Sequence, residues 1–226
     1  AEVVVFERGP FVSYGACGMP YNIEDPARDI EDLVVITPER FRKERGIDVR
    51  TGHEVVAIDR AAKKVAVRIV ATGKQQEHAY DRLVLATGAS PIRPSLPGVN
   101  LPGVMVLRDL LDGRAMKDYL AELRPRSVVI VGGGYIGMEM ADVLRKRGLA
   151  VTVIEKLADV VPGYEVEIAS EVRAELERKG IGVHLGVTVE TIEPGGKRDG
   201  DGLVVRTSSG MHTADMVVLA VGIRPN

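Results

Sequence analysis

The stretch VVIVGGGYIG at residues 128–137 decides the fold of the larger part of this chain. Its four leading apolar residues are typical of a strand buried in a parallel sheet. Glycines follow at the spacing of a phosphate-binding loop. Gly132 permits a tight turn, Gly134 lets a pyrophosphate approach the backbone, and Gly137 lets the next helix pack on the sheet. Because a helix N-terminus also offers amide groups to an anion, the stretch predicts a dinucleotide-binding site.

The residues after this loop complete a strand, helix and strand unit. Apolar positions recur at helical spacing from Tyr135 to Lys146, and residues 151–154 form the next predicted strand. Glu155 follows that strand, close to the offset of about 20 residues expected of an acid that binds the adenosine ribose. Its carboxylate would repel a 2′-phosphate, so Glu155 favours NADH over NADPH, although Lys156 weakens the preference. A turn without any ligand is the alternative interpretation.

Short apolar runs and turn residues predict the remaining elements. Residues 91–102 contain four prolines, which is the composition of a domain crossing. A helix should begin after the N-cap Thr37 with Pro38 and end at Arg45, before Gly46. Further helices are expected at residues 110–123 and 165–179. Strands are expected at residues 3–6, 49–50, 55–59, 65–70, 83–86, 183–185, 189–192, 203–206 and 217–220.

The composition is that of an ordinary globular protein, with 45% hydrophobic and 27% charged residues and a formal net charge of −2. Lysine and arginine are neither in excess nor concentrated, so no nucleic-acid partner is expected. No apolar run approaches the ~18 residues of a membrane span, so no membrane partner is expected either. No metal site is predicted. A single cysteine excludes an internal disulfide and favours a cytoplasmic location.

That cysteine, Cys17, lies in the segment SYGACGMPY at residues 13–21. A lone cysteine is most often a small buried hydrophobe. This one instead has glycines and polar residues around it, in a connecting segment. Pro20 suits the first turn of a short helix, whose N-terminus would favour the thiolate. Cys17 is therefore a candidate redox residue.

Together these motifs resemble the single-cysteine flavoprotein disulfide reductases, which include coenzyme A disulfide reductases, NADH oxidases, NADH peroxidases and polysulfide reductases. The resemblance implies an α/β fold in which a Rossmann-like NAD(H) domain is inserted in an incomplete FAD-binding Rossmann-like domain. The FAD domain would span residues 1–106 and the NAD(H) domain 107–222, with residues 223–226 returning to the FAD domain. The matching features are Ser13, Cys17, Gly18, Pro20, Tyr21, residues 37–39 with Phe41, residues 86–89, residues 133–137 with Glu139, and residues 221–226.

The resemblance also implies roles for single residues. Cys17 would face one side of the flavin, while Tyr135 would cover the other side until NADH arrives and Glu139 would contact the nicotinamide. Ser13 and Arg45 match positions that bind coenzyme A. NADH would be bound by Gly132, Gly134, Tyr135, Ile136, Gly137 and Glu155. FAD would be contacted by Glu7, Arg8, Val55, Thr87, Gly88 and Gly222.

The implied activity is electron transfer from NADH, with NADPH as the alternative, through FAD to Cys17, which would reduce coenzyme A disulfide, a persulfide or a polysulfide. An NADH oxidase or peroxidase and a non-catalytic NADH-binding module are the alternatives, with a ferredoxin-reductase-like flavoprotein a weaker one. Ala16 stands where coenzyme A disulfide reductases usually carry asparagine, which weakens the case for coenzyme A. Relatives have a glycine-rich FAD loop upstream and a dimerisation domain downstream. We therefore expect a piece of a longer homodimer that binds FAD poorly alone.

Overall fold

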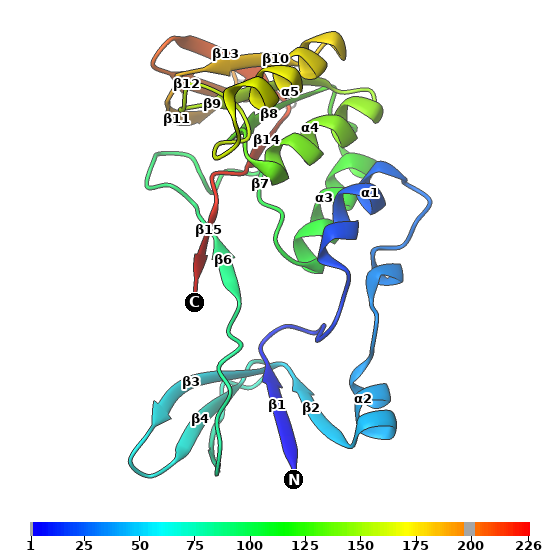
Figure 1. Cartoon of the computed structure of the whole chain (residues 1–226), viewed down its shortest axis with the longest axis vertical. Helices are drawn as coiled ribbons and strands as arrows, with labels where there is room; N and C mark the ends of the chain where they lie inside the picture. The colour runs from blue at the N-terminus through cyan, green and yellow to red at the C-terminus, as the bar shows by residue number, and fades with distance from the viewer. Residues whose placement is uncertain (1, 197–201) are drawn as a thin grey trace. The chain divides into compact units, whose positions relative to one another are not determined.

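The computed structural model describes residues 2–196 and 202–226, which form two compact units (Figure 1). The first unit comprises Ala1–Ala16 and Glu31–Thr87, and the second comprises Cys17–Ile30 and Gly88–Asn226. These units are defined by packing. The assignment of residues 1–106 and 107–222 to FAD and NAD(H) refers to cofactors, and it stays a prediction.

The second unit is built on a parallel sheet, as the glycine-rich stretch predicts. Its five strands within the described residues have the order β10-β9-β8-β14-β7. They span Gly182–Leu185 (β10), Ala150–Glu155 (β9), Ser127–Val131 (β8), Met216–Leu219 (β14) and Val104–Met105 (β7). Residues 128–130 of β8 are at most 1% exposed, because a strand covered on both faces must be apolar throughout.

Three helices and a second sheet surround this parallel sheet. The helices are α3 (Leu110–Glu122), α4 (Tyr135–Lys146) and α5 (Val166–Arg178), and α4 packs on β8 and β9. An antiparallel sheet is formed by β11 (Val189–Pro194), β12 (Leu203–Thr207) and β13 (Gly210–Ala214). It shares one hydrophobic core with the parallel sheet, through side chains such as Val205, Val129 and Leu219. A short helix, α1 (Met19–Glu24), follows a 3-10 turn at Ala16–Gly18, and β6 (Ala89–Pro91) pairs with β15 (Ile223–Pro225).

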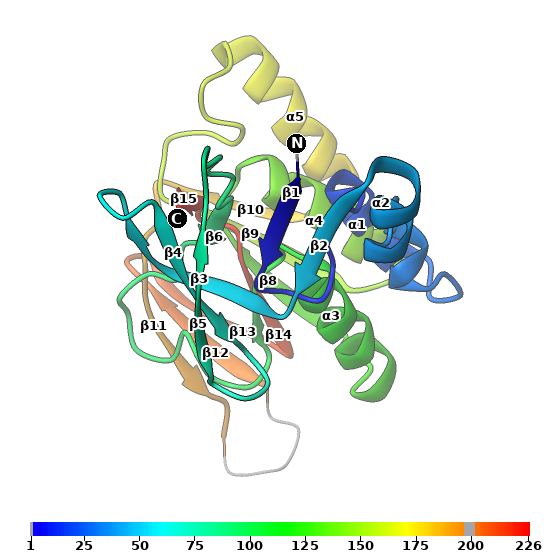
Figure 2. The ribbon, with the colours of Figure 1, turned by 90° about the horizontal axis from the view of Figure 1, so that it is seen from below.

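The first unit holds a parallel pair and an antiparallel meander. Strands β1 (Val3–Glu7) and β2 (Ile47–Thr51) lie side by side in both views (Figures 1 and 2). The meander consists of β3 (His53–Asp59), β4 (Lys64–Ile69) and β5 (Gln75–Ala79). Helix α2 (Pro38–Arg45) begins as predicted, because the Thr37 side chain accepts a hydrogen bond from the Arg40 amide, and it ends at Gly46 with φ +65°. A 3-10 turn at Ile30–Leu33 precedes it.

One predicted strand is wrong. Residues 83–86 join no ladder in the described part of the chain, and the Val84 and Leu85 side chains are 84% and 67% exposed. An apolar run becomes a strand only where a neighbouring strand offers backbone partners, and these residues have none there. Strands β5 and β13 were not predicted, because the segments QQEHA and GMHTA are too polar to show an apolar period.

No helix within residues 2–196 and 202–226 combines the length and the apolar character needed to cross a bilayer.

Candidate functional site

Each of the three glycines of the loop has a distinct geometric role. Gly132 has φ +109°, and a Cβ there would lie 2.4 Å from the carbonyl oxygen of Ala220. A Cβ on Gly137 would lie 2.0 Å from the carbonyl oxygen of Gly132, so α4 packs directly on the loop. A Cβ on Gly134 would meet no atom of the described residues within 4 Å. Two glycines therefore permit the fold, and Gly134 leaves the backbone open to a ligand.

Helix α4 begins beside this open position. Its N-cap is Gly134, and no side chain of the described residues caps it. The first backbone hydrogen bond runs from the Met138 amide to the Gly134 carbonyl, at 2.9 Å. The preceding amides of the first turn can therefore donate to an anion, and the helix dipole adds partial positive charge. This combination fits the pyrophosphate of a dinucleotide.

Glu155 lies beneath the loop at the end of β9, and it is only 6% exposed. Its Oε2 accepts a hydrogen bond from the Gly133 amide at 2.6 Å, and its Oε1 accepts one from the Leu157 amide at 2.8 Å. A carboxylate has about four lone-pair directions, so two remain for further donors. Glu7 ends β1 in the first unit, and it likewise accepts a hydrogen bond from a backbone amide, that of Gly9, at 2.6 Å.

Tyr135 opens α4 and is 64% exposed. Its ring meets that of Tyr164 edge to face, with the centroids 6.0 Å apart. The loop that carries Tyr164 is tied to the glycine loop, because the Val161 amide donates to the Gly133 carbonyl at 2.7 Å. Glu139 is exposed one helical turn after Tyr135, so both side chains lie on the same face of α4. Tyr164 was not predicted as a site residue, since it lies in an irregular loop without a periodic pattern.

A hydrogen bond with Tyr164 raises the pKa of Tyr135 above the ordinary value of a tyrosine. We expect Tyr164→Phe to lower the pKa of Tyr135 toward that value, because the substitution removes the partner hydroxyl. An ultraviolet difference titration against the Tyr135→Phe Tyr164→Phe double variant would isolate the transition. Tyr119→Phe is the matched control, since the Tyr119 hydroxyl donates to the Asp215 carbonyl at 2.7 Å instead. An unchanged Tyr135 titration in Tyr164→Phe would contradict this prediction.

Cys17 is exposed, and it lies in the 3-10 turn directly before α1. Pro20 stands in the first turn of α1, as the sequence predicts. By packing, Cys17 belongs to the same unit as the glycine loop.

The predicted residues are divided between the two units. The second unit contains Cys17, Gly88, Gly132, Gly134, Tyr135, Ile136, Gly137, Glu139, Glu155 and Gly222. The first unit holds Glu7, Arg8, Ser13, Arg45, Val55 and Thr87. Gly88 and Gly222 lie at the paired strands β6 and β15, where the Asn226 amide donates to the Gly88 carbonyl and the Ile92 amide donates to the Gly222 carbonyl.

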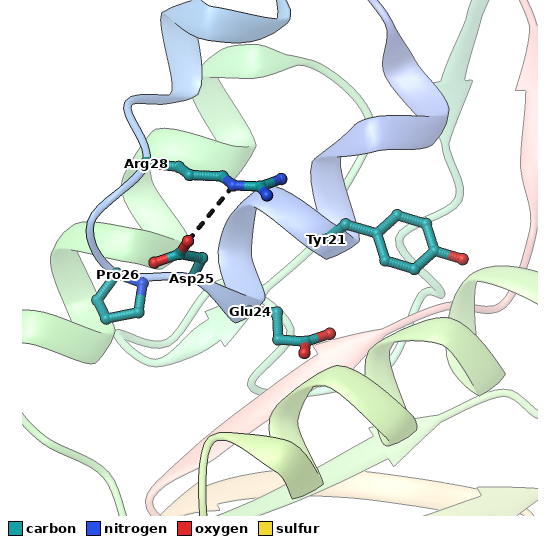
Figure 3. A pocket seen from close by; sticks show the side chains of 5 residues that line it. All are labelled: Tyr21, Glu24, Asp25, Pro26 and Arg28. Carbon is teal, nitrogen blue, oxygen red and sulfur yellow. Dashed lines mark ion pairs between the residues drawn. The ribbon is translucent and has the colours of Figure 1, made fainter.

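A pocket of about 650 Å³ lies along α1 and the turn after it (Figure 3). An ion pair of 3.3 Å joins Arg28 and Asp25 at its wall. None of its lining residues was predicted as a site residue, because their mixed charges are typical of a solvated surface. The lining residues are Tyr21, Glu24, Asp25, Pro26 and Arg28. No group of three or more candidate metal ligands occurs in the described part of the chain.

The parallel sheet, the open glycine loop and the acid at the end of β9 define a dinucleotide-binding protein of the Rossmann type. The chain belongs to the pyridine nucleotide-disulphide oxidoreductase family, which matches residues 1–226. It is 37% identical to an NADH oxidase of Methanocaldococcus jannaschii, covering 100% of this chain and 49% of that protein. It is 35% identical to an NAD(P)H coenzyme A polysulfide/persulfide reductase of Pyrococcus horikoshii, covering 100% of this chain and 48% of that protein. The chain thus spans about half the length of these curated relatives.

Solved structures agree with this assignment. Reduced Bacillus anthracis CoADR-RHD superposes with a TM-score of 0.93 at 35% identity, over 100% of this chain and 40% of that one. The water-forming NADH oxidase of Lactobacillus brevis, bound to NADH, gives 0.93 at 30% identity, over 100% and 49% of the two chains. An engineered water-forming NADPH oxidase derived from it, bound to NADPH, gives 0.92 at 29% identity, again over 100% and 49%.

Proposed function

We propose that this chain supplies the nicotinamide-binding unit and the redox cysteine of an FAD-dependent NAD(P)H oxidoreductase that reduces coenzyme A disulfide, a persulfide or a polysulfide. The observation that best supports this proposal is that the exposed thiol of Cys17 belongs to the same compact unit as the open glycine loop. Relatives named polysulfide/persulfide reductase and CoADR support the choice of acceptor. We also propose that the protein is a homodimer and lies in the cytoplasm. Its unpaired thiol supports a reducing compartment.

NADH is the proposed nicotinamide nucleotide, bound by the glycine loop and by Glu155. The buried carboxylate of Glu155 would accept hydrogen bonds from ribose hydroxyls and repel a 2′-phosphate. The engineered NADPH oxidase supports this argument, because its substitutions remove an aspartate and introduce two arginines. Tyr135 and Glu139, on one exposed face of α4, would meet the nicotinamide end.

FAD is the proposed second cofactor. Glu7 would bind its ribose, in the role proposed for Glu155 toward NADH, with Arg8, Val55, Thr87, Gly88 and Gly222 as further contacts. When bound, FAD would accept a hydride from NADH and pass two electrons to sulfur.

Cys17 would perform the sulfur chemistry. Its thiolate would attack one sulfur of the acceptor, which breaks the sulfur–sulfur bond and releases the other half as a thiolate. The resulting mixed disulfide would then take up two electrons and a proton, which regenerates Cys17 and releases the second thiol. For a disulfide RSSR the balance is NADH + H⁺ + RSSR → NAD⁺ + 2 RSH. Ser13 and Arg45 are proposed contacts of a coenzyme A group.

An NADH oxidase or peroxidase is the second candidate. The similarity to two NADH oxidases favours it, and an exposed thiol can be oxidised to a sulfenic acid by peroxide. Steady-state NADH oxidation by the protein that carries this chain, with coenzyme A disulfide, polysulfide, hydrogen peroxide and oxygen in parallel, separates the two. Turnover with the sulfur acceptors at least about tenfold above that with oxygen supports the reductase. The reverse order would establish the oxidase.

A further inference from the structure

The segment that carries Cys17 packs on helices that follow it by about 100 residues in the sequence. Helix α1 contacts both α3 and α4, although residues on either side of the segment belong to the first unit. Ile23 and Ile30 are 0% and 3% exposed. Gly113 of α3 makes room for Ile30, because a Cβ there would lie 3.0 Å from the Ile30 Cδ1 atom. The segment is thus a built part of the second unit.

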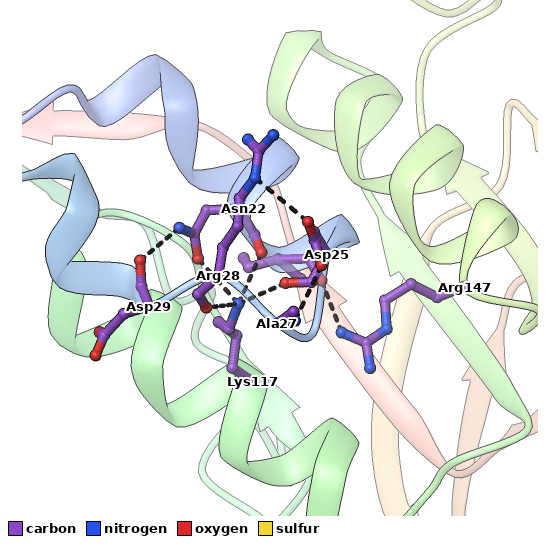
Figure 4. Close-up of polar contacts among 8 residues, drawn as sticks. Asn22, Asp25, Ala27, Arg28, Asp29, Lys117 and Arg147 are labelled. Atoms are coloured by element: carbon purple, nitrogen blue, oxygen red, sulfur yellow. Dashed lines mark hydrogen bonds and ion pairs between the residues drawn. The ribbon is translucent and has the colours of Figure 1, made fainter.

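The ammonium group of Lys117, on α3, closes the loop at the far end of α1 (Figure 4). Its Nζ donates to the carbonyl oxygens of Asn22, Asp25 and Arg28, at 2.8, 2.8 and 2.6 Å. The side-chain oxygen of Asn22 is a fourth acceptor, at 3.0 Å. The other side-chain atom of Asn22, Nδ2, donates to the carbonyl of Asp29 at 2.7 Å. One cation therefore joins the last turn of α1 to the loop that follows it, through Asn22, Asp25 and Arg28.

Helix α4 adds two further contacts to α1. Arg147 Nη1 donates to the Ile23 carbonyl at 2.7 Å, and Lys146 forms an ion pair with Glu24 at 3.2 Å. The ion pair between Lys146 and Glu24 is exposed, and exposed ion pairs contribute little to the free energy of unfolding. Lys117 makes the larger set of bonds, and its removal would take a charged donor from three backbone carbonyl groups at once.

Helix α1 has only six residues, and a helix this short does not form without tertiary contacts. Cys17 stands immediately before it. We propose that Lys117 is a positioning residue for Cys17: by fixing the far end of α1 on α3, it holds the thiol in the place from which it acts. The catalytic part of this inference rests on the redox role proposed above for Cys17.

The claim that Lys117 holds the Cys17 segment in place can be tested without measuring turnover. Cys17 is the only cysteine of this chain, so a label that reacts with thiols attaches there. A nitroxide attached to its sulfur reports mobility by electron paramagnetic resonance, and amide exchange reports the order of residues 19–30. We expect Lys117→Met to sharpen the nitroxide spectrum and to speed exchange in that segment by about tenfold or more. Tyr119→Phe, on the same helix, is the matched control. If Lys117→Met and Tyr119→Phe behave alike in both measurements, Lys117 does not position the segment.

The catalytic part is tested in the protein that carries this chain. We expect Lys117→Met to lower kcat for the sulfur acceptor by about 100-fold, as misplacement of a reacting group by 1 Å can do, with flavin reduction by NADH changed less than about twofold. Lys117→Arg keeps a cation with several donors and should restore most of the loss. If Lys117→Met fails to fold, Lys117→Arg can still be compared with the parent protein in both measurements. A mobile thiol with undiminished turnover in Lys117→Met would overturn the catalytic claim. Full turnover in Cys17→Ser would show instead that the redox role proposed for Cys17 is wrong.

Discussion

Replacement of Cys17 by serine is expected to lower NADH-dependent reduction of a disulfide or polysulfide by about 1,000-fold or more, with NADH binding retained. A serine hydroxyl stays protonated near neutral pH and has no accessible redox chemistry, so neither the attack on sulfur nor the mixed disulfide can form. Because Cys17 is exposed within a 3-10 turn, the change of one atom should leave the packing intact. Steady-state NADH oxidation with each acceptor measures the effect.

Single-turnover flavin reduction by NADH is the internal control, since it precedes the cysteine in the proposed sequence of steps. It should proceed in Cys17→Ser at a rate within about twofold of the parent. Equal acceptor rates in parent and variant would show that the thiol takes no part, and a flavin oxidase would then be the remaining function. Loss of both half-reactions would point instead to a damaged fold.

Two glycine-to-alanine substitutions in the glycine loop should have large but different effects, one on stability and the other on NADH affinity. Gly132→Ala should destabilise the second unit by about 3 kcal/mol or more, because its φ of +109° is strained for alanine and the new Cβ would overlap the Ala220 carbonyl oxygen. Gly134→Ala should cost less than about 1 kcal/mol, because its φ of −78° suits alanine and the site is open. The same methyl group should weaken NADH binding by about tenfold or more, since it blocks the phosphate's approach.

Thermal unfolding and NADH titration of both variants measure these two effects independently. Gly134→Ala serves as the matched control for Gly132→Ala in stability, and its affinity loss should occur with a much smaller fall in Tm than that of Gly132→Ala. Normal NADH affinity in a stable Gly134→Ala variant would mean that the phosphates do not pass over this position.

The sequence predicts those parts of the fold in which local chemistry and tertiary packing agree. Helix α4 occupies the predicted residues 135–146, since its apolar spacing, the glycine loop before it and Gly148 after it all favour the same limits. Helix α2 likewise has the predicted cap at Thr37. The strand predicted at residues 83–86 failed because apolar character shows what a segment would bury, and not which strand will pair with it.

The candidate site was predicted where a motif ties chemistry to spacing, as at Gly134 and Glu155. Tyr164 and Lys117 were not predicted. Tyr164 meets Tyr135 through an irregular loop, and Lys117 meets Asn22 across 95 residues of sequence, as one of many lysines. Such partners are determined by the fold, because a contact between residues far apart in the sequence produces no periodic pattern in that sequence. The roles assigned to Ser13 and Arg45 come from the resemblance and stay predictions.

The carboxylate of Glu155 has a consequence for anyone who wishes to redesign this protein for NADPH. Both of its oxygens anchor backbone amides, one in the glycine loop and one at Leu157, so the residue proposed to select the nucleotide also braces the loop that grips it. A substitution at this single position would alter preference and architecture at once. Changes at Lys156 and Leu157, which follow Glu155 and have exposed side chains, offer a more evolvable starting point.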